Sequence, residues 1–246
     1  MYAAVKSYSL KGKLIKKKDL QTLAESRNLD ELIMRIKNTT YAEAISKLTK
    51  PFTAQRIELR LRDKQSDLHH TMILASGGDN LLFAYYLKFI LRNLKIILKG
   101  KILNKTQEQI ENSISLHAEE LIGERDIVVR AIVAKNFEEA VATLKTIGIG
   151  EEIAEACAQY NEKKQIQALE LYFDKFFYQN ISHALKSHND HSLRSLCYME
   201  IDYYNIMSIL RGKFWNLDEN QLQKLLVSRD RKSTRLNSSH GYISYA

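Results

Sequence analysis

Apolar residues recur every three or four positions through most of this chain, which is the period of a helix with one buried face. The predicted short helices of the N-terminal part lie at 5–15, 18–25, 29–37 and 41–48. The predicted long helices lie at 51–75, 79–103, 162–187 and 190–214. One proline and nine glycines leave few places for tight turns. The pattern therefore predicts an all-α protein made of helical bundles.

Two helix boundaries carry their own signals. Pro51 suits the first turn of a helix, where its missing N–H costs no hydrogen bond. The run Ser76-Gly77-Gly78-Asp79 is typical of a turn between two long helices, with Asp79 capping the second.

The sequence also repeats itself. Segment 27–32 (RNLDEL) recurs as 135–140 (KNFEEA), and both copies place an Asn at a helix start with a Glu three residues later. Segment 98–104 (LKGKILN) recurs as 210–216 (LRGKFWN), 112 residues further on. The matches keep the same order along the chain, which favours a duplication over chance similarity.

The repeat predicts the domain organisation. Two tandem helical-bundle repeats are expected over 1–108 and 109–218, and residues 219–230 begin a third repeat that is not completed. Leu217, Leu222, Leu225 and Leu226 are spaced as an apolar helix face, part of which we expect to be exposed. The Ser-rich stretch 231–246 lacks helical periodicity and is interpreted as a non-native tail.

Composition and charge indicate which partners and which cellular location to expect for this protein. The net charge of +8 favours acidic partners, which include nucleic acid, anionic lipid and acidic protein surfaces. Cys157 and Cys197 lie in apolar helical segments and fit no disulfide framework. No stretch of 18 apolar residues or secretory signal is present, so a cytoplasmic location without a transmembrane segment is expected.

Candidate chemistry is sparse. Gly77-Gly78 and Gly148-Ile149-Gly150 lack the strand-to-helix context of a nucleotide site. His183, His188 and His191 do not share one helix face, and a solvated turn explains them better than a metal site. Glu119-Glu120 is interpreted as a solvated helix start. We predict no catalytic residue, no cofactor or nucleotide and no metal.

One charged pattern is more distinctive. Lys88, Arg92, Lys95 and Lys99 are spaced 4, 3 and 4, which places them on one helix face. No acidic residue offers an i to i+4 partner, so the four charges are expected to repel one another along the helix. A solvated face is the plain interpretation, and a partner-binding surface is the alternative. This set is called the basic stripe below.

Three segments resemble a known family. They are Tyr2 to Leu14 (YAAVKSYSLKGKL), Leu29 to Tyr41 (LDELIMRIKNTTY) and Tyr203 to Lys213 (YYNIMSILRGK). All three are similar to the C subunit of the archaeal and bacterial A/V-type rotary ATPases, whose eukaryotic equivalent is the d subunit. The resemblance implies three similar helical bundles around a pseudo-threefold funnel. Since only residues 219–230 would begin the third bundle, the chain is expected to be truncated at its C-terminal side.

The resemblance also implies a role. Such a protein is non-catalytic and couples the central shaft to the membrane rotor ring during proton or sodium transport. Its partners are the shaft subunits and the ring, and it is peripheral on the cytoplasmic face of the membrane through the ATPase complex. The alternative from another class is a basic helical-repeat module that binds nucleic acid. That alternative is weaker because Tyr172, Phe173, Phe176 and Phe177 are predicted to be core and not a base-stacking surface.

Overall fold

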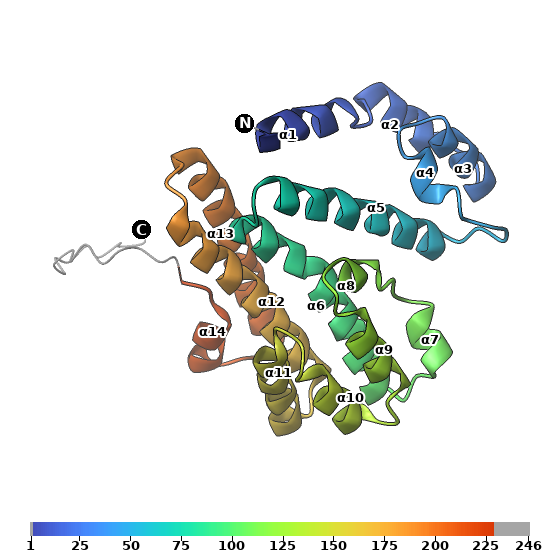
Figure 1. Cartoon of the computed structure of the whole chain (residues 1–246). Helices are drawn as coiled ribbons and strands as arrows, with labels where there is room; N and C mark the ends of the chain where they lie inside the picture. The colour runs from blue at the N-terminus through green and yellow to red at the C-terminus, as the bar shows by residue number, and fades with distance from the viewer. Residues whose placement is uncertain (1, 229–246) are drawn as a thin grey trace. The chain divides into compact units, whose positions relative to one another are not determined.

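The computed structural model describes residues 2–228, which form fourteen α-helices and one 3-10 turn, with no strand in this part of the chain (Figure 1). The predicted all-α class is therefore confirmed. The stretch 231–246, interpreted above as a non-native tail, lies outside the described residues.

The helices fall into two compact units, Met1–Phe177 and a second that begins at Tyr178, with the division inside one long helix. The short helices of the first unit are α1 (Tyr2–Gly12), α2 (Lys17–Ala24), α3 (Leu29–Lys37), α4 (Ala42–Ile45), α7 (Gln107–Glu111), α8 (His117–Leu121), α9 (Arg125–Val133), α10 (Phe137–Leu144) and α11 (Gly150–Lys163). Its long helices are α5 (Ala54–Ala75), α6 (Asn80–Ile102) and most of α12 (Ile166–Ala184). The second unit holds the end of α12, the 3-10 turn η1 (Leu185–Ser187), α13 (His191–Phe214) and α14 (Glu219–Leu225).

The predicted boundaries agree with the structure to within about four residues, and they agree best at α3 and α6. Helix α3 spans the predicted residues, and Asp79 caps α6 by accepting hydrogen bonds from the N–H groups of Leu81 and Leu82, both at 3.0 Å. Pro51, however, lies before α5 and not in its first turn. The side chain of Thr53 accepts a hydrogen bond from Arg56 N at 3.2 Å, which starts the helix at Ala54.

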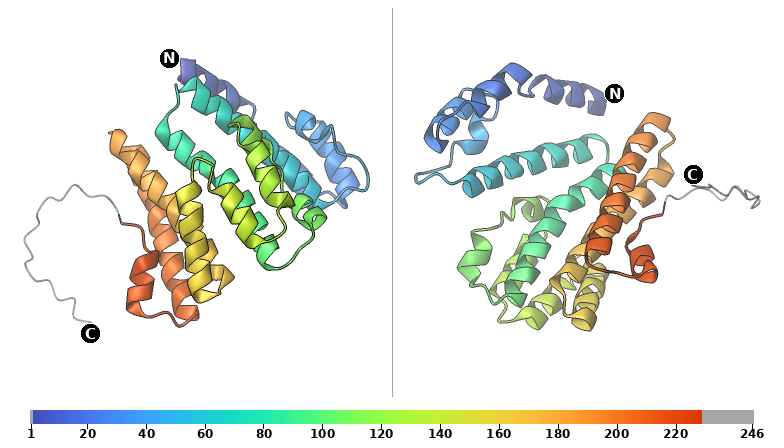
Figure 2. Two further views of the ribbon diagram at one scale, coloured as in Figure 1. Left: turned by 60° about the horizontal axis from the view of Figure 1, so that its bottom comes forward. Right: turned by 180° about the vertical axis from the view of Figure 1, so that it is seen from behind.

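The core of the first unit is organised around α6. Twelve of its 23 residues are buried, and they cover all of the helix surface except the face that carries Lys88, Arg92, Lys95 and Lys99. Figure 2 shows α6 running alongside α8, α9 and α10, while α5 packs on it as the other half of an antiparallel hairpin. A smaller cluster joins α3, α4 and α5 through Ile33, Ile36, Ile45 and Ile57. A helix with so wide a buried surface is held by neighbours on several sides.

In the second unit, α13 is buried along one face only. That face consists of Cys197, Ile201, Tyr204, Ser208 and Gly212. The ring of Tyr204 stacks on Tyr178 with centroids 4.5 Å apart. Leu222 of α14 is 8% exposed, and the other leucines expected on the apolar face of α14 are half-buried. Part of this face was predicted to be exposed; α14 folds back onto α13, which buries Leu222 and leaves the other three leucines half-buried.

The ends of α6 and α13 are built alike, each within its own unit. Gly100 and Gly212, which are 112 residues apart, each lie under a buried side chain of the following short helix. A Cβ added to Gly100 would lie 2.7 Å from Ile110, and one added to Gly212 would lie 2.2 Å from Leu222. Only glycine allows these approaches without a shift of the neighbouring side chain.

Further pairs at the same spacing of 112 share a local geometry. Asn104 and Asn216 both follow the long helix with positive φ, 51° and 56°. Each is followed by a capping box, which begins at Thr106 in one case and at Asp218 in the other.

Two amide contacts also recur at this spacing. The Asn93 side-chain nitrogen donates to Ser115 O at 2.7 Å, and that of Asn205 donates to Val227 O at 2.9 Å. The two tandem repeats stay a prediction, which this local likeness supports.

The two Asn caps predicted from the repeated segments 27–32 and 135–140 also have the same geometry. Asn28 accepts from Glu31 N and Asn136 accepts from Glu139 N, both at 2.9 Å. In return, each Glu carboxylate accepts the N–H of the residue before the Asn, also at 2.9 Å. The predicted caps are confirmed, and each satisfies backbone donors that a helix start leaves without an intrahelical partner.

Candidate functional site

The basic stripe lies on α6 within the first unit, and carboxylates of other helices face Arg92, Lys95 and Lys99. Lys95 Nζ lies 2.7 Å from Asp174 Oδ1, and Lys99 Nζ lies 2.5 Å from Glu170 Oε1, so both reach α12. Arg92 lies 3.6 Å from Glu58 of α5. Lys88 is exposed, with its ammonium 4.9 Å from the centre of the Phe89 ring.

The expectation of uncompensated charge on this stripe was wrong. The carboxylates that pair with Lys95 and Lys99 are 79 and 71 residues away in sequence. A search for partners four residues away on the same helix cannot find them. The contacts show that the stripe links α6 to α12 inside the unit, while its partner-binding role stays a prediction.

Removal of the Lys99 charge tests how much this link stabilises the unit. Both side chains of the Lys99–Glu170 pair are more than a third exposed, 35% and 39%. We expect Lys99→Ala to lower the free energy of unfolding by less than about 1 kcal/mol, because solvent screens such a pair. Urea unfolding measures this, with exposed Lys47→Ala as the control. A loss larger than about 2 kcal/mol would show that the pair is shielded from water.

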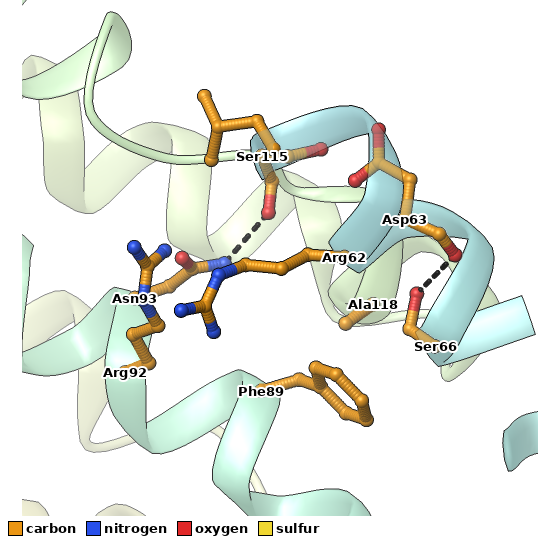
Figure 3. Close-up of a pocket in the computed structure, with 9 residues that line it drawn as sticks. Arg62, Asp63, Ser66, Phe89, Arg92, Asn93, Ser115 and Ala118 are labelled. Atoms are coloured by element: carbon orange, nitrogen blue, oxygen red, sulfur yellow. Dashed lines mark hydrogen bonds between the residues drawn. The ribbon is translucent and has the colours of Figure 1, made fainter. Parts of the chain in front are cut away.

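A small open pocket lies between α5, α6 and the segment before α8 (Figure 3). Arg62 and Arg92 line it, and Glu58 binds both, with its Oε1 2.6 Å from Arg62 and 3.6 Å from Arg92. Burial, followed by the charge of Arg62, lowers the pKa of Arg92. The dashed bond from Asn93 to Ser115 O shows how the loop is held against α6.

Next to this pocket lies the carboxyl group of Glu119, which the sequence analysis predicted to be exposed to solvent. Glu119 is fully buried, and Asn93 Nδ2 donates to its two oxygens at 2.9 and 3.1 Å. Burial raises the pKa of Glu119 to about 7 against the lowering effect of the Asn93 bond. The interpretation of Glu119 as part of a solvated helix start was wrong, since α8 turns this residue toward α6.

Two further contacts hold α8 in place. The Tyr86 hydroxyl donates to Ala118 O at 2.9 Å, and the His117 ring lies 2.6 Å from Asp67 of α5. Burial lowers the pKa of His117, but the hydrogen bond to Asp67 and the charge of that carboxylate outweigh it and raise the pKa overall. These polar contacts position a helix and do not form a catalytic arrangement with a nucleophile and its base.

Of the three histidines considered for a metal site, His191 is the first residue of α13. The residue before it, Asp190, caps this helix by accepting a hydrogen bond from Leu193 N at 2.7 Å. Among residues 2–228 no group of three His, Cys, Asp or Glu side chains could hold a metal ion. Cys157 and Cys197 are buried free thiols. Each helix in the described part of the chain is too short or too polar to cross a membrane.

Comparison with known proteins decides the family. The family model described as ATP synthase (C/AC39) subunit matches residues 3–235. The chain belongs to this family. Curated members that it matches are named as C subunits of A-type ATP synthases. That of Methanocaldococcus jannaschii is 25% identical over 85% of this chain and 54% of its own length. That of Methanosphaera stadtmanae is 24% identical over 88% and 55%.

This C/AC39 family chain thus spans about half the length of the curated relatives it matches. The relative from Archaeoglobus fulgidus shows the same relation, at 25% identity over 86% of this chain and 60% of its own length. No solved structure matches the chain. The resemblance drawn from the three sequence segments is confirmed at the level of the family.

Proposed function

We propose that this chain provides part of the non-catalytic coupling subunit of a rotary A/V-type ATPase. The observation that carries the proposal is the family match over residues 3–235. The fold is compatible with it, because the polar groups of the first unit join helices to one another and do not converge on a reaction centre. In this role the chain transmits force between subunits while other subunits carry out the chemistry.

The partners in this proposal are the central shaft subunits and the membrane rotor ring, and the location is the cytoplasmic face of the membrane. Names of the curated relatives support only assembly within an ATP synthase. Exposed Lys88 is the residue of the basic stripe best placed to contact a partner. The nucleic-acid alternative loses much of its support, since Lys95 and Lys99 face carboxylates of the chain itself.

A reconstitution experiment tests the proposed function. Purified chain is added to A-type ATPase complexes from which the protein of this family has been removed, and co-sedimentation, ATP hydrolysis and ATP-driven ion uptake are measured. We expect the chain to bind the complex and to show no ATP hydrolysis of its own. Ion uptake should stay below the level that a full-length relative restores, because the chain corresponds to about half of that length.

Two controls sharpen this test. The full-length Methanocaldococcus jannaschii relative shows that the depleted complexes can be restored. Lys88→Glu reports whether the exposed end of the basic stripe contributes to binding. If the relative binds and this chain does not, or if this chain hydrolyses ATP by itself, the coupling role is wrong.

A further inference from the structure

Helix α13 carries two apolar faces on opposite sides. One face is buried within the second unit, as described above. The other consists of Leu196, Met199, Tyr203, Ile206, Leu210 and Phe214. These six residues are called the α13 stripe. Each is between 52% and 83% exposed, and their spacing of 3, 4, 3, 4 and 4 aligns them along one side of the helix.

Such a pattern is typical of a helix that lies between two layers. A surface helix of a globular protein has one apolar face and one polar face, whereas a helix that is apolar on opposite sides is covered on both. Six large apolar side chains in a continuous row also exceed the scattered exposed residues that need no explanation. The α13 stripe therefore has the pattern of a contact surface.

The internal repeat indicates what covers it. The residues 112 positions before the α13 stripe belong to α6, and they are Ala84, Leu87, Leu91, Leu94, Leu98 and Ile102. The first five are at most 5% exposed, and Ile102 is half-buried. The leucines belong to one core cluster with Val128, Ala131, Ile132, Ala140, Val141 and Leu144 of α9 and α10. On α6, the equivalent stripe is thus covered by the helices that follow it.

The register of the repeat indicates that the helices covering the α13 stripe would follow directly after α14 in sequence. Asn205 and Val227 repeat the contact of Asn93 and Ser115, so Ser228 corresponds to Leu116, the residue directly before α8. In this register, the counterparts of α8, α9 and α10 would begin immediately after Ser228.

A hydrogen-bond contact at the end of α6 also indicates that a helix corresponding to α9 would cover the α13 stripe. Lys101, near the end of α6, donates hydrogen bonds to the carbonyl oxygens of Ile132, at 2.6 Å, and Ala134. These carbonyls end α9, where backbone acceptors are left without intrahelical donors. The residue 112 positions later is Lys213, which is exposed. It lies beside Phe214 of the α13 stripe and can make the same contact to an added helix.

We propose that the α13 stripe is the docking face for a helical segment of this same family that corresponds to α8–α10. The segment would present small and branched apolar side chains to the stripe, and the carbonyl end of its second helix to Lys213. This proposal rests on the repeat and the family, and it does not depend on the coupling role.

Cysteine labelling tests the docking directly. Ile206→Cys is introduced on the stripe, and Met34→Cys, on an exposed apolar residue of α3, is the matched control. The native thiols, Cys157 and Cys197, are 3% and 1% exposed and contribute little background. Each variant is prepared as the chain alone and as residues 1–228 joined to the part of the Methanocaldococcus jannaschii relative that follows the aligned region.

In the chain alone, both cysteines should react with a maleimide at the rate of an exposed thiol. In the joined protein, labelling at position 206 should slow by at least about tenfold, because a covered thiol reacts only when the contact opens. Labelling at position 34 should not change. Lys213→Ala should restore part of the lost reactivity at position 206 in the joined protein.

Equal labelling at position 206 in both proteins would overturn the proposal. So would slow labelling in the chain alone that depends on its concentration, since a second copy would then be the occupant. Co-expression of the relative's segment as a separate chain gives a second measurement that does not rely on the junction. The docking is supported if the segment co-purifies with the unaltered chain and with Met34→Glu/Leu74→Glu but does not co-purify with Ile206→Glu/Leu210→Glu. Co-purification that survives the stripe substitutions, or none with the unaltered chain, counts against it.

Discussion

Glu119→Gln is expected to stabilise the protein at pH 8 and to leave its stability at pH 5 nearly unchanged. Glu119 is fully buried, and its pKa is raised from 4.5 to about 7 in the folded protein. Burial is the main cause, and the charges of Glu124 and Asp63 add to it. A glutamine keeps an oxygen for the Asn93 hydrogen bond and never ionises.

The direction in which stability changes with pH follows from proton binding in the folded and unfolded states. Between pH 4.5 and about 7 the folded state holds the proton of Glu119 and the unfolded state has lost it, so stability falls as pH rises through this window. The full loss is on the order of 3 kcal/mol, since each unit of pKa shift corresponds to about 1.4 kcal/mol. Glu119→Gln removes this loss.

Urea unfolding at a series of pH values between 4 and 9 measures the effect. Exposed Glu138→Gln is the control and should keep the pH dependence of the unaltered protein. A smaller dependence of the same sign should remain in Glu119→Gln, because the pKa of His117 is raised in the folded state and its stabilising charge is lost as pH rises. A Glu119→Gln protein that is less stable at pH 8 than the unaltered one would show that the ionised carboxylate stabilises α8.

Gly100→Ala should destabilise the protein strongly. Its new Cβ would lie 2.7 Å from Ile110 Cγ1 and 2.8 Å from Cδ1, and Ile110 is 1% exposed. Ile110 belongs to the packed core, where a shift of its side chain disturbs its neighbours, so we expect a loss of about 1–3 kcal/mol in the free energy of unfolding. Thermal and urea unfolding both report this value.

Two matched variants make this measurement specific. Gly12→Ala lies at the end of α1, where an added Cβ meets nothing within 4 Å, and it should cost little. Gly100→Ala is also measured in an Ile110→Ala background, because alanine at position 110 removes both atoms that the new Cβ would meet. If Gly100→Ala costs as much in that background as in the unaltered protein, the close contact with Ile110 is not the cause of the loss.

Local chemistry in the sequence determined much of the fold. The apolar period of the long helices indicated their existence and nearly their ends, because each buries a face that repeats with the turn of the helix. The caps at Asn28, Asn136 and Asp79 were predictable since a cap involves residues only two or three positions apart. Pro51 was misplaced because Thr53, a stronger start signal, follows it within two residues.

The sequence alone did not determine which charged and apolar groups face one another. Lys95 and Lys99 looked unpaired because their carboxylates belong to α12, more than 70 positions away. Glu119 looked solvated because nothing next to it in sequence shows that α8 packs on α5 and α6. Leu222 was expected on a partly exposed face, but α14 folds onto α13 and buries it. Local propensity acts within one turn of a helix, whereas burial and charge pairing are set by packing between helices distant in sequence, and only the tertiary structure decided those.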